Sequence, residues 1–369
     1  MEPELVEIVE SSLVAPSENT PKERHWLTNF DLSVPPTIYT SFIYLYRFNG
    51  DSDFFSVSNI KTALAKALVL FYPLAGRLAT DKDGRLEIDC NGEGAFFVVA
   101  RSKLTLDNLK GYQPSAENRK LFVPVVNSEG ETPPLLLLQI TFLESSDVVL
   151  GVAFNHCIVD VHSDFHFIHT LTNIARCNNS TVPPPFLDRT ILRARSPPFC
   201  PLNHPEHLHV EYLKSNGHTG VYPSFISTIL KLSKDQIDYL KSRPRCGSYS
   251  YTISTFQAVS AHIWKCLCLA RGLAHDKESH LLFPAEIRSR ISPPLPKYFV
   301  GNTGTCGLVI AKVSEVIGFI PERIGEAVVR IDDAYVRESI DYLEVADKDS
   351  LLKRFGMTAY DMCMETRFL

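Results

Sequence analysis

One run of the sequence, residues 147–160, constrains this chain most, because it leads an apolar segment directly to a histidine. Residues 147–154 read Asp-Val-Val-Leu-Gly-Val-Ala-Phe, and a short apolar run between polar flanks is typical of a buried strand. Of the twelve histidines, only His156 is followed four residues later by an aspartate, Asp160. An imidazole presented at the end of a strand is able to take a proton from a buried hydroxyl or amine. The run therefore favours acyl transfer. Because this spacing alone is common, a loop histidine with an unrelated aspartate is the alternative.

Length and composition indicate a large globular protein. The chain has 369 residues, 45% of them hydrophobic, which is enough for a core in two domains or one large one. Its net charge of -5 at pH 7, without a basic run, argues against nucleic acid or an anionic membrane as a partner. The acidic start does not fit a signal peptide, and no apolar stretch is long enough for a membrane span. We therefore expect a soluble, cytoplasmic protein, and its nine scattered cysteines predict reduced thiols.

Strand-like and helix-like patterns are mixed along the chain, which predicts an α/β fold. The predicted strands are 5–9, 42–46, 85–90, 95–100, 135–142, 148–154, 224–232 and 281–287. The predicted helices are 59–70, 233–242, 254–271 and 320–342. Turn sequences at Asp83-Gly84 and Asn91-Gly92 bracket the strand at 85–90 and predict a meander with the strand that follows.

A proline-rich stretch without periodicity predicts a crossover between two domains. On this basis we expect an N-terminal domain at 1–185, a linker at 186–223 and a C-terminal domain at 224–369.

Two histidine clusters contain ligand types that suit zinc. They are His204, His207 and His209 beside Cys200, and His162, His166 and His169. The first cluster lies in the proline-rich stretch without paired spacing, so a solvated linker is the favoured interpretation. The second falls on one predicted helical face, where ordinary packing is the simpler explanation. We therefore expect no metal site.

Nucleophilic catalysis by the chain itself is disfavoured. Cys157 is adjacent to His156, but adjacent side chains point apart, and no orienting Asn or Asp is identifiable. The sequence also lacks a Gly-x-Ser-x-Gly elbow, which argues against a serine hydrolase.

Several segments, taken together, resemble the plant BAHD acyl-CoA-dependent acyltransferases, and within them the hydroxycinnamoyl-CoA shikimate/quinate branch. The matching segments span nearly the whole chain and are Thr20–Leu32, Tyr44–Arg47, Leu64–Leu78, Gly84–Asn91, Phe186–Arg195 and Asp341–Leu343. The resemblance implies a two-domain fold like that of chloramphenicol acetyltransferase, with mixed sheets and a channel between the domains. It implies acyl-CoA and a small-molecule acceptor as substrates, no further cofactor, no nucleic-acid or membrane partner, and a monomer.

The resemblance also implies roles for the residues of the histidine run. His156 takes the place of the family's general base, which removes a proton from the acceptor as it attacks the thioester. Asp160 takes the place of the structural aspartate, which points away from substrate and pairs with an arginine; Arg288 is the candidate here.

Further residues match binding positions of the family. Ser254 and Thr255, at the start of a predicted helix, resemble the segment beside the CoA pantetheine and phosphate, although simple N-capping is the alternative. Arg288 is also a candidate for the CoA-binding side, and Arg290 is a candidate for a CoA phosphate or is a surface arginine. Thr40 and Tyr44 lie where this branch lines its acceptor pocket, and an ordinary strand face is the alternative.

The chain departs from the family pattern in several places. Val161 follows Asp160 where the family has glycine, and a β-branched residue would be strained if that backbone is left-handed. Glu286 stands where Asp or Asn is usual, and Ile287 where glycine is common in this branch. The Asp-Phe-Gly-Trp-Gly motif of the family is absent, so the ending at Leu369 resembles a C-terminal truncation.

These features together predict a transferase that moves a hydroxycinnamoyl group, for example p-coumaroyl, from CoA to a hydroxyl such as that of shikimate or quinate, or to an amine. The alternatives are a catalytically impaired or non-catalytic acyl-CoA-binding remnant of the family, and a thioester hydrolase whose open pocket admits water.

Overall fold

The computed structural model describes residues 5–109, 116–125, 132–177, 182–201, 229–243 and 252–346. The chain is mixed α/β and divides into two compact units. Met1–Arg193 with Pro296–Asn302 form the first unit, and Ala194–Leu295 with Thr303–Leu369 form the second. A segment from late in the chain, 296–302, therefore packs with the first unit. The predicted linker at 186–223 lies largely outside the described residues, so its boundaries stay a prediction.

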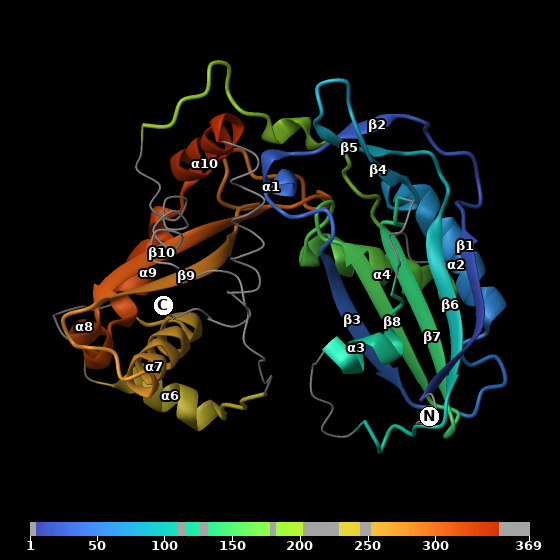
Figure 1. The fold of residues 1–369 in the computed structure, drawn as a ribbon, viewed down its shortest axis with the longest axis horizontal. Helices are drawn as coiled ribbons and strands as arrows, with labels where there is room; N and C mark the ends of the chain where they lie inside the picture. The colour runs from blue at the N-terminus through green and yellow to red at the C-terminus, as the bar shows by residue number, and fades with distance from the viewer. Residues whose placement is uncertain are drawn as a thin grey trace. The chain divides into compact units, whose positions relative to one another are not determined.

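A five-stranded sheet organises the first unit, in the order β1-β6-β7-β8-β3 (Figure 1). The strands are β1 Val6–Val14, β3 Tyr39–Tyr46, β6 Ala95–Ser102, β7 Leu136–Leu143 and β8 Val148–Asn155. Neighbours are antiparallel except β6 and β7, which are parallel. All eight residues of β8 are buried, which accounts for its nearly unbroken apolar sequence. The antiparallel strand pair predicted to lead to His156 is confirmed as β7 and β8.

Two helices lie on one face of this sheet. α2 (Val57–Leu70) and α4 (Val161–Ala175) pack against each other. Phe167 of α4 meets Phe154 of β8 edge-on, with ring centroids 5.6 Å apart. Side chains alternate between the two faces along a strand. Every second residue of β8 counted from Phe154, and the residues of β3 paired with them, therefore also face α4.

A third helix, α3 (Ala116–Phe122), lies on the opposite face. Its end approaches Gly151 of β8 so closely that a Cβ at Gly151 would meet the Phe122 carbonyl oxygen at 1.7 Å. Glycine is therefore required here for the backbones to pack.

A three-stranded antiparallel sheet completes the strands of the first unit, in the order β2-β5-β4. Its strands are β2 Arg24–Trp26, β4 Arg77–Thr80 and β5 Leu86–Asp89. The turn at Asp83-Gly84 joins β4 to β5, with Gly84 at φ +79°. The predicted meander across Asn91-Gly92 is wrong, because β5 and β6 belong to different sheets. Both edges of β6 are already paired, with β1 and β7.

Three short helices complete the described part of this unit. They are α1 Asn29–Leu32, η1 Tyr72–Ala75 and η2 Arg189–Leu192. Thr28 and Asp31 form a capping box at α1, in which each side chain bonds the other residue's backbone N–H.

The second unit contains an antiparallel strand pair, β9 (Glu278–Glu286) with β10 (Gly304–Lys312). Its described helices are α6 Lys234–Ser242, α7 Thr255–Ala270, α8 Val313–Gly318, α9 Pro321–Arg330 and α10 Asp333–Val345. α7 packs against α6, α8 and α9. No helix built from the described residues has the length and apolarity that a bilayer crossing needs.

Two predictions in this unit need correction. The helix predicted at 320–342 is two helices, because Ile331 has non-helical backbone angles and Asp332 starts a new helix by accepting a 2.9 Å hydrogen bond from the Tyr335 N–H. For the strand predicted at 224–232, residues 224–228 lie outside the described residues, and 229–232 are not in a strand. The helices predicted at 233–242 and 254–271 are confirmed, with Ser233 and Ser254 as their N-caps.

Candidate active site

His156 directly follows β8 and is fixed by two hydrogen bonds. Its backbone N–H donates to the Ile38 carbonyl at 2.8 Å, and its ring Nδ1 lies 3.0 Å from the Val159 carbonyl oxygen. A carbonyl only accepts, so Nδ1 carries the proton in this contact and Nε2 is the basic nitrogen. The half-buried imidazole is therefore held in the tautomer that a general base needs.

Asp160 caps α4. Its Oδ1 accepts a 3.0 Å hydrogen bond from the Ser163 N–H and a 2.9 Å bond from the Ser163 hydroxyl. A side-chain oxygen at this position satisfies a free N–H at the helix start. Residues 156–160, between β8 and α4, are called the His156 loop below. Asp160 ends this loop and anchors the helix that follows it.

Val161 is the first residue of α4 and is not among the residues with positive φ. The strain expected from a β-branched residue after Asp160 is therefore absent. The Val161 side chain is 43% exposed, so it does not crowd the buried part of the loop.

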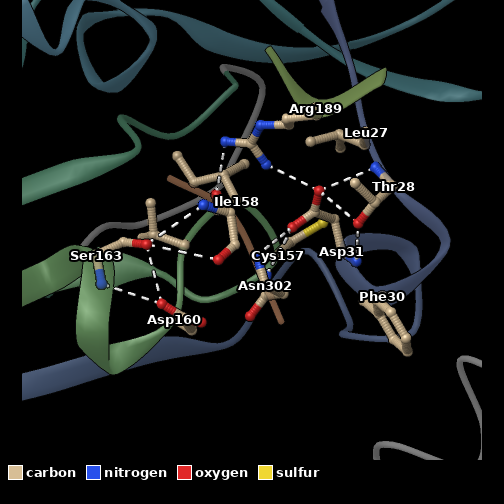
Figure 2. A network of polar contacts seen from close by, with 12 residues as sticks. Leu27, Thr28, Phe30, Asp31, Cys157, Ile158, Asp160, Ser163, Arg189 and Asn302 are labelled. Carbon is tan, nitrogen blue, oxygen red and sulfur yellow. Dashed lines mark hydrogen bonds and ion pairs between the residues drawn. The ribbon is translucent and has the colours of Figure 1, made fainter. Parts of the chain in front are cut away.

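A buried ion pair contacts the loop that holds His156 at the Ile158 carbonyl (Figure 2). Arg189 Nη1 donates to Asp31 Oδ2 at 2.8 Å, with the two side chains 3% and 0% exposed. The same Asp31 oxygen accepts 2.9 Å bonds from the Thr28 N–H and hydroxyl. Arg189 Nη2 also donates to the Ile158 carbonyl at 2.8 Å. Both members of this buried charged pair therefore have further hydrogen-bond partners, and Arg189 also bonds the loop.

Asn302 ties the other end of the loop to the same aspartate (Figure 2). Its Nδ2 donates to Asp31 Oδ1 and to the His156 carbonyl, both at 2.9 Å, and its backbone N–H donates to Asp31 Oδ1 at 2.8 Å. Asp31, Arg189 and Asn302 are called the loop anchor below. They hold the carbonyls of His156 and Ile158, which flank Cys157.

Cys157 is a packing residue within this loop. It is fully buried, and its N–H donates to the Asn155 side chain at 3.1 Å. Burial, reinforced by the Asp31 charge, raises the pKa of the Cys157 thiol far above neutrality. A protonated, buried thiol is a poor nucleophile, which agrees with the expectation from sequence.

Thr40 and Tyr44 lie on the face of β3 that meets α4, opposite Phe154 and Leu150 respectively. The Tyr44 hydroxyl oxygen is buried and has no hydrogen-bond partner among the described residues. Burial raises the pKa of Tyr44. Their place in an acceptor pocket stays a prediction.

Arg288 belongs to the second unit and is buried there. Its Nη1 bonds the Thr303 hydroxyl and lies 3.4 Å from Glu286 Oε1, which also accepts a 2.6 Å bond from the Arg288 N–H. Glu286 therefore contacts both the backbone N–H and the guanidinium of Arg288 within the second unit. A pair between Arg288 and Asp160 would join residues of different units, and it stays a prediction.

Ser254 is the N-cap of α7 in a full capping box with Gln257, over distances of 2.8 and 3.2 Å. Thr255 is the first residue of α7 and is exposed. Arg290 Nη1 donates to the Val328 and Ile331 carbonyls at 2.8 Å, at the end of α9. These bonds give Ser254 and Arg290 structural roles, and their contact with CoA stays a prediction.

The described ranges contain no group of three His, Cys, Asp or Glu side chains placed to hold a metal ion. Within α4, His166 Nε2 lies 3.0 Å from the Pro183 carbonyl, and His169 Nε2 lies 3.1 Å from Asn173. His204, His207 and His209 lie outside the described residues.

The loop anchor was not predicted from the sequence. A signal existed for Asp31, since Thr28-x-x-Asp31 has the spacing of a capping box. Asn302 carried no local signal, because it reaches the loop from a segment 146 residues after His156.

Comparison with known proteins identifies the family. The model of the Transferase family matches residues 4–363. Shikimate O-hydroxycinnamoyltransferase of Nicotiana tabacum is 38% identical over 92% of this chain and 80% of that protein. Putrescine hydroxycinnamoyltransferase 1 of Oryza sativa subsp. japonica is 42% identical over 92% and 78% respectively.

Solved structures show the same fold. Vinorine synthase matches with a TM-score of 0.61 and 25% identity over 96% of this chain and 80% of that one. TRI101 of F. graminearum, complexed with coenzyme A and T-2 mycotoxin, matches with a TM-score of 0.71 and 16% identity over 89% and 81% respectively. The chain therefore belongs to the Transferase family, the BAHD acyl-CoA-dependent acyltransferases.

Proposed function

We propose that this acyltransferase moves a hydroxycinnamoyl group, such as p-coumaroyl, from CoA to an acceptor hydroxyl such as that of shikimate or quinate, with His156 as the general base. The names of the relatives support the donor class, since each describes a hydroxycinnamoyltransferase. The observation that carries the proposal is the bond between His156 Nδ1 and the Val159 carbonyl, which leaves Nε2 as the basic nitrogen.

The reaction follows from this tautomer. Nε2 takes the proton of the acceptor hydroxyl as its oxygen attacks the thioester carbonyl carbon. The tetrahedral intermediate then collapses, the carbon–sulfur bond breaks, and the imidazolium returns its proton to the CoA thiolate. The products are an ester and CoA, and no acyl-enzyme forms. The scheme includes no metal or further cofactor, because the thioester is already activated and the imidazole handles the proton.

For donor binding, the proposal uses the start of α7. The first amides of a 16-residue helix attract anionic groups, so Ser254 and Thr255 are assigned to the CoA side, with Arg290 as an additional cation. Arg288 is assigned as the partner of Asp160.

The test follows CoA thiol release from p-coumaroyl-CoA by the purified chain, with and without shikimate. We expect release that depends on the acceptor and is abolished by His156→Ala. His169→Ala is the matched control, because His169 is exposed on α4, away from the loop, and it is expected to keep wild-type activity.

Each alternative gives a different result. Release without acceptor that still needs His156 would indicate a thioester hydrolase. No release from a sample with a cooperative thermal transition would indicate a non-catalytic acyl-CoA-binding protein. Either result would overturn the proposed transfer.

A further inference from the structure

A short segment from late in the chain is held against the first unit. Residues 296–302, called the strap below, belong to that unit, although the residues on both sides of them belong to the second. The Phe186 N–H donates to the Tyr298 carbonyl at 2.8 Å, and the Val300 N–H donates to the Phe186 carbonyl at 2.9 Å. Phe186 and Phe299 thereby form a parallel bridge. The strap is therefore fixed to the first unit through its backbone.

The end of the strap reaches the His156 loop. The Gly301 N–H donates to the Ser163 hydroxyl at 3.3 Å, and this hydroxyl donates to Asp160, the N-cap of α4. Asn302 donates to the His156 carbonyl, as described above. The placement of the strap therefore sets the placement of the loop that carries the proposed base.

The middle of the strap is held by a histidine of α4. The His166 ring lies 4.8 Å from the Tyr298 ring and 5.1 Å from the Phe71 ring, measured between centroids. Its Nε2 lies 3.0 Å from the carbonyl oxygen of Pro183, in the stretch that leads to Phe186. His166 thus contacts both the strap and the segment with which the strap pairs.

These contacts suit a neutral imidazole. A carbonyl only accepts, so Nε2 of His166 carries the proton and Nδ1 is unprotonated. Nδ1 is buried and has no hydrogen-bond partner among the described residues. A second proton there would place a charge and an N–H without an acceptor in an aromatic setting, which is unfavourable.

The charged and titratable groups around the ring do not offset such a charge. They are His162 and His169 on α4, and Lys297 and Tyr298 on the strap, where the Lys297 ammonium lies 5.2 Å from the Tyr298 ring centre. None of these groups is a carboxylate. Within the described part of the chain, a protonated His166 therefore faces only neutral or positive neighbours.

We propose that His166 is a positioning residue for the proposed base: its neutral ring holds the strap, and protonation of the ring at acid pH releases the strap from the His156 loop. This role rests on the transfer chemistry proposed above and adds a residue to it. His166 touches no substrate in this scheme and acts through Tyr298 and Asn302.

The direction of the pH effect follows from the docked and released states of the strap. Burial lowers the pKa of His166 below 6.5 in the docked state, and His162 and His169 act in the same direction, against the bond to Pro183. In the released state the ring is solvated, and its pKa returns to about 6.5. The released state therefore binds the proton more readily. Release becomes about tenfold more favourable per unit as the pH falls from 6.5 to the docked pKa.

Hydrogen exchange followed by mass spectrometry tests the strap without catalysis. The N–H groups of Val300 and Asn302 are bonded within the first unit, so their protection reports the docked strap. After correction for the intrinsic exchange rate, we expect protection in the wild type to fall about tenfold per pH unit below 6.5. His166→Gln keeps a side-chain N–H donor and does not titrate, so its protection should stay constant from pH 7.5 to pH 5.5.

Steady-state kinetics connect the strap to the base. Relative to pH 7.5, kcat for CoA release from p-coumaroyl-CoA with shikimate should fall at least about threefold more by pH 5.5 in the wild type than in His166→Gln. KM for p-coumaroyl-CoA should change in parallel in the two proteins. His169→Gln, which changes an exposed histidine of the same helix, is the matched control and is expected to follow the wild type.

A second variant keeps the test decisive if glutamine disturbs the fold. Tyr298→Leu removes the ring that His166 contacts, so the strap should lose protection at pH 7.5, and kcat should fall while KM changes little. Constant protection of the wild-type strap from pH 7.5 to pH 5.5 would overturn the role of His166 whatever the variants show. An equal fall of protection in the wild type and His166→Gln would overturn it as well.

The two proposals fail separately. Acceptor-dependent CoA release that His156→Ala abolishes, with strap protection that does not change with pH, would leave the transfer in place and overturn the role of His166. A loss of protection that needs His166, in a chain without CoA release from any acceptor, would support the link between His166 and the strap and overturn the transfer.

Discussion

Arg189 and Asp31 form an ion pair of 2.8 Å in the core of the first unit, with both side chains almost fully buried. The two residues are 158 positions apart in the chain. Arg189 also holds the Ile158 carbonyl, and Asp31 holds Asn302, which bonds the His156 carbonyl. One buried pair thereby fixes the loop that presents the proposed base.

Removing one member of this pair should destabilise the fold strongly. Arg189→Met leaves the Asp31 carboxylate buried without its cation, and such losses cost about 3–5 kcal/mol. Urea unfolding of the variant measures this change. Arg24→Met is the matched control, since Arg24 is 47% exposed and lies 3.8 Å from Glu87, a contact expected to contribute less than about 1 kcal/mol. Equal stability of the two variants would contradict a structural role for the buried pair.

Loss of the Asn302 side chain should affect catalysis more than substrate binding. Asn302→Ala removes the bond to the His156 carbonyl, so the imidazole is less well placed, and a misplaced catalytic group lowers kcat by up to about 100-fold. We expect KM for p-coumaroyl-CoA to change little. Steady-state kinetics of CoA release provide both constants.

Asn59→Ala is the control for Asn302→Ala. Asn59 makes the same kind of bond, from its side chain to the Ala175 carbonyl at 3.0 Å, on the exposed side of α2. Its kcat should match the wild type. An unchanged kcat in a folded Asn302→Ala protein would show that the loop is positioned without this bond.

Local patterns predicted the elements next to His156 correctly. β7 and β8 form from apolar runs with polar flanks, and they pair antiparallel as predicted. The two helices predicted to begin after Ser233 and Ser254, elsewhere in the chain, also form, with these serines as N-caps. These features depend on residues close together in the chain, so the sequence contains the information directly.

Long-range partners were not predictable in this way. The break between α9 and α10 overrides a continuous helical pattern, because Asp332 caps a second helix there. β5 pairs with β4 and β2 although β6 follows it. Asn302 and Arg189 reach the His156 loop only once the tertiary structure exists, and no spacing between them indicates this contact.

Stability should fall as pH rises because of Asp164. Its pKa is raised from 3.8 to about 9 by burial and by the Asp160 charge, so between these values the folded state binds a proton that the unfolded state has lost. The free energy of unfolding therefore decreases with rising pH, by up to about 1.4 kcal/mol per unit. Urea unfolding from pH 5 to pH 8 measures the slope.

The comparison with Asp164→Asn isolates this group. The variant lacks the titrating carboxyl, so its stability should exceed that of the wild type increasingly as the pH rises. Asp53→Asn, which changes an exposed aspartate of the first unit, should follow the wild-type curve. Parallel curves for the wild type and Asp164→Asn would mean that the folded carboxyl titrates normally.

Replacing Val161 by glycine should bring no gain in activity, although glycine is the residue that the family pattern has after the aspartate. Val161 begins α4 in a helical conformation, so no left-handed backbone strain exists for glycine to relieve. Glycine instead loses more conformational freedom on folding, which costs about 0.5–1 kcal/mol within a helix and less at its first residue. We expect a slightly lower Tm and an unchanged rate of CoA release for Val161→Gly.

Val329→Gly, at an exposed position inside α9, is the comparison variant and should lower the Tm more. A marked rise in kcat for Val161→Gly would show that valine strains the His156 loop.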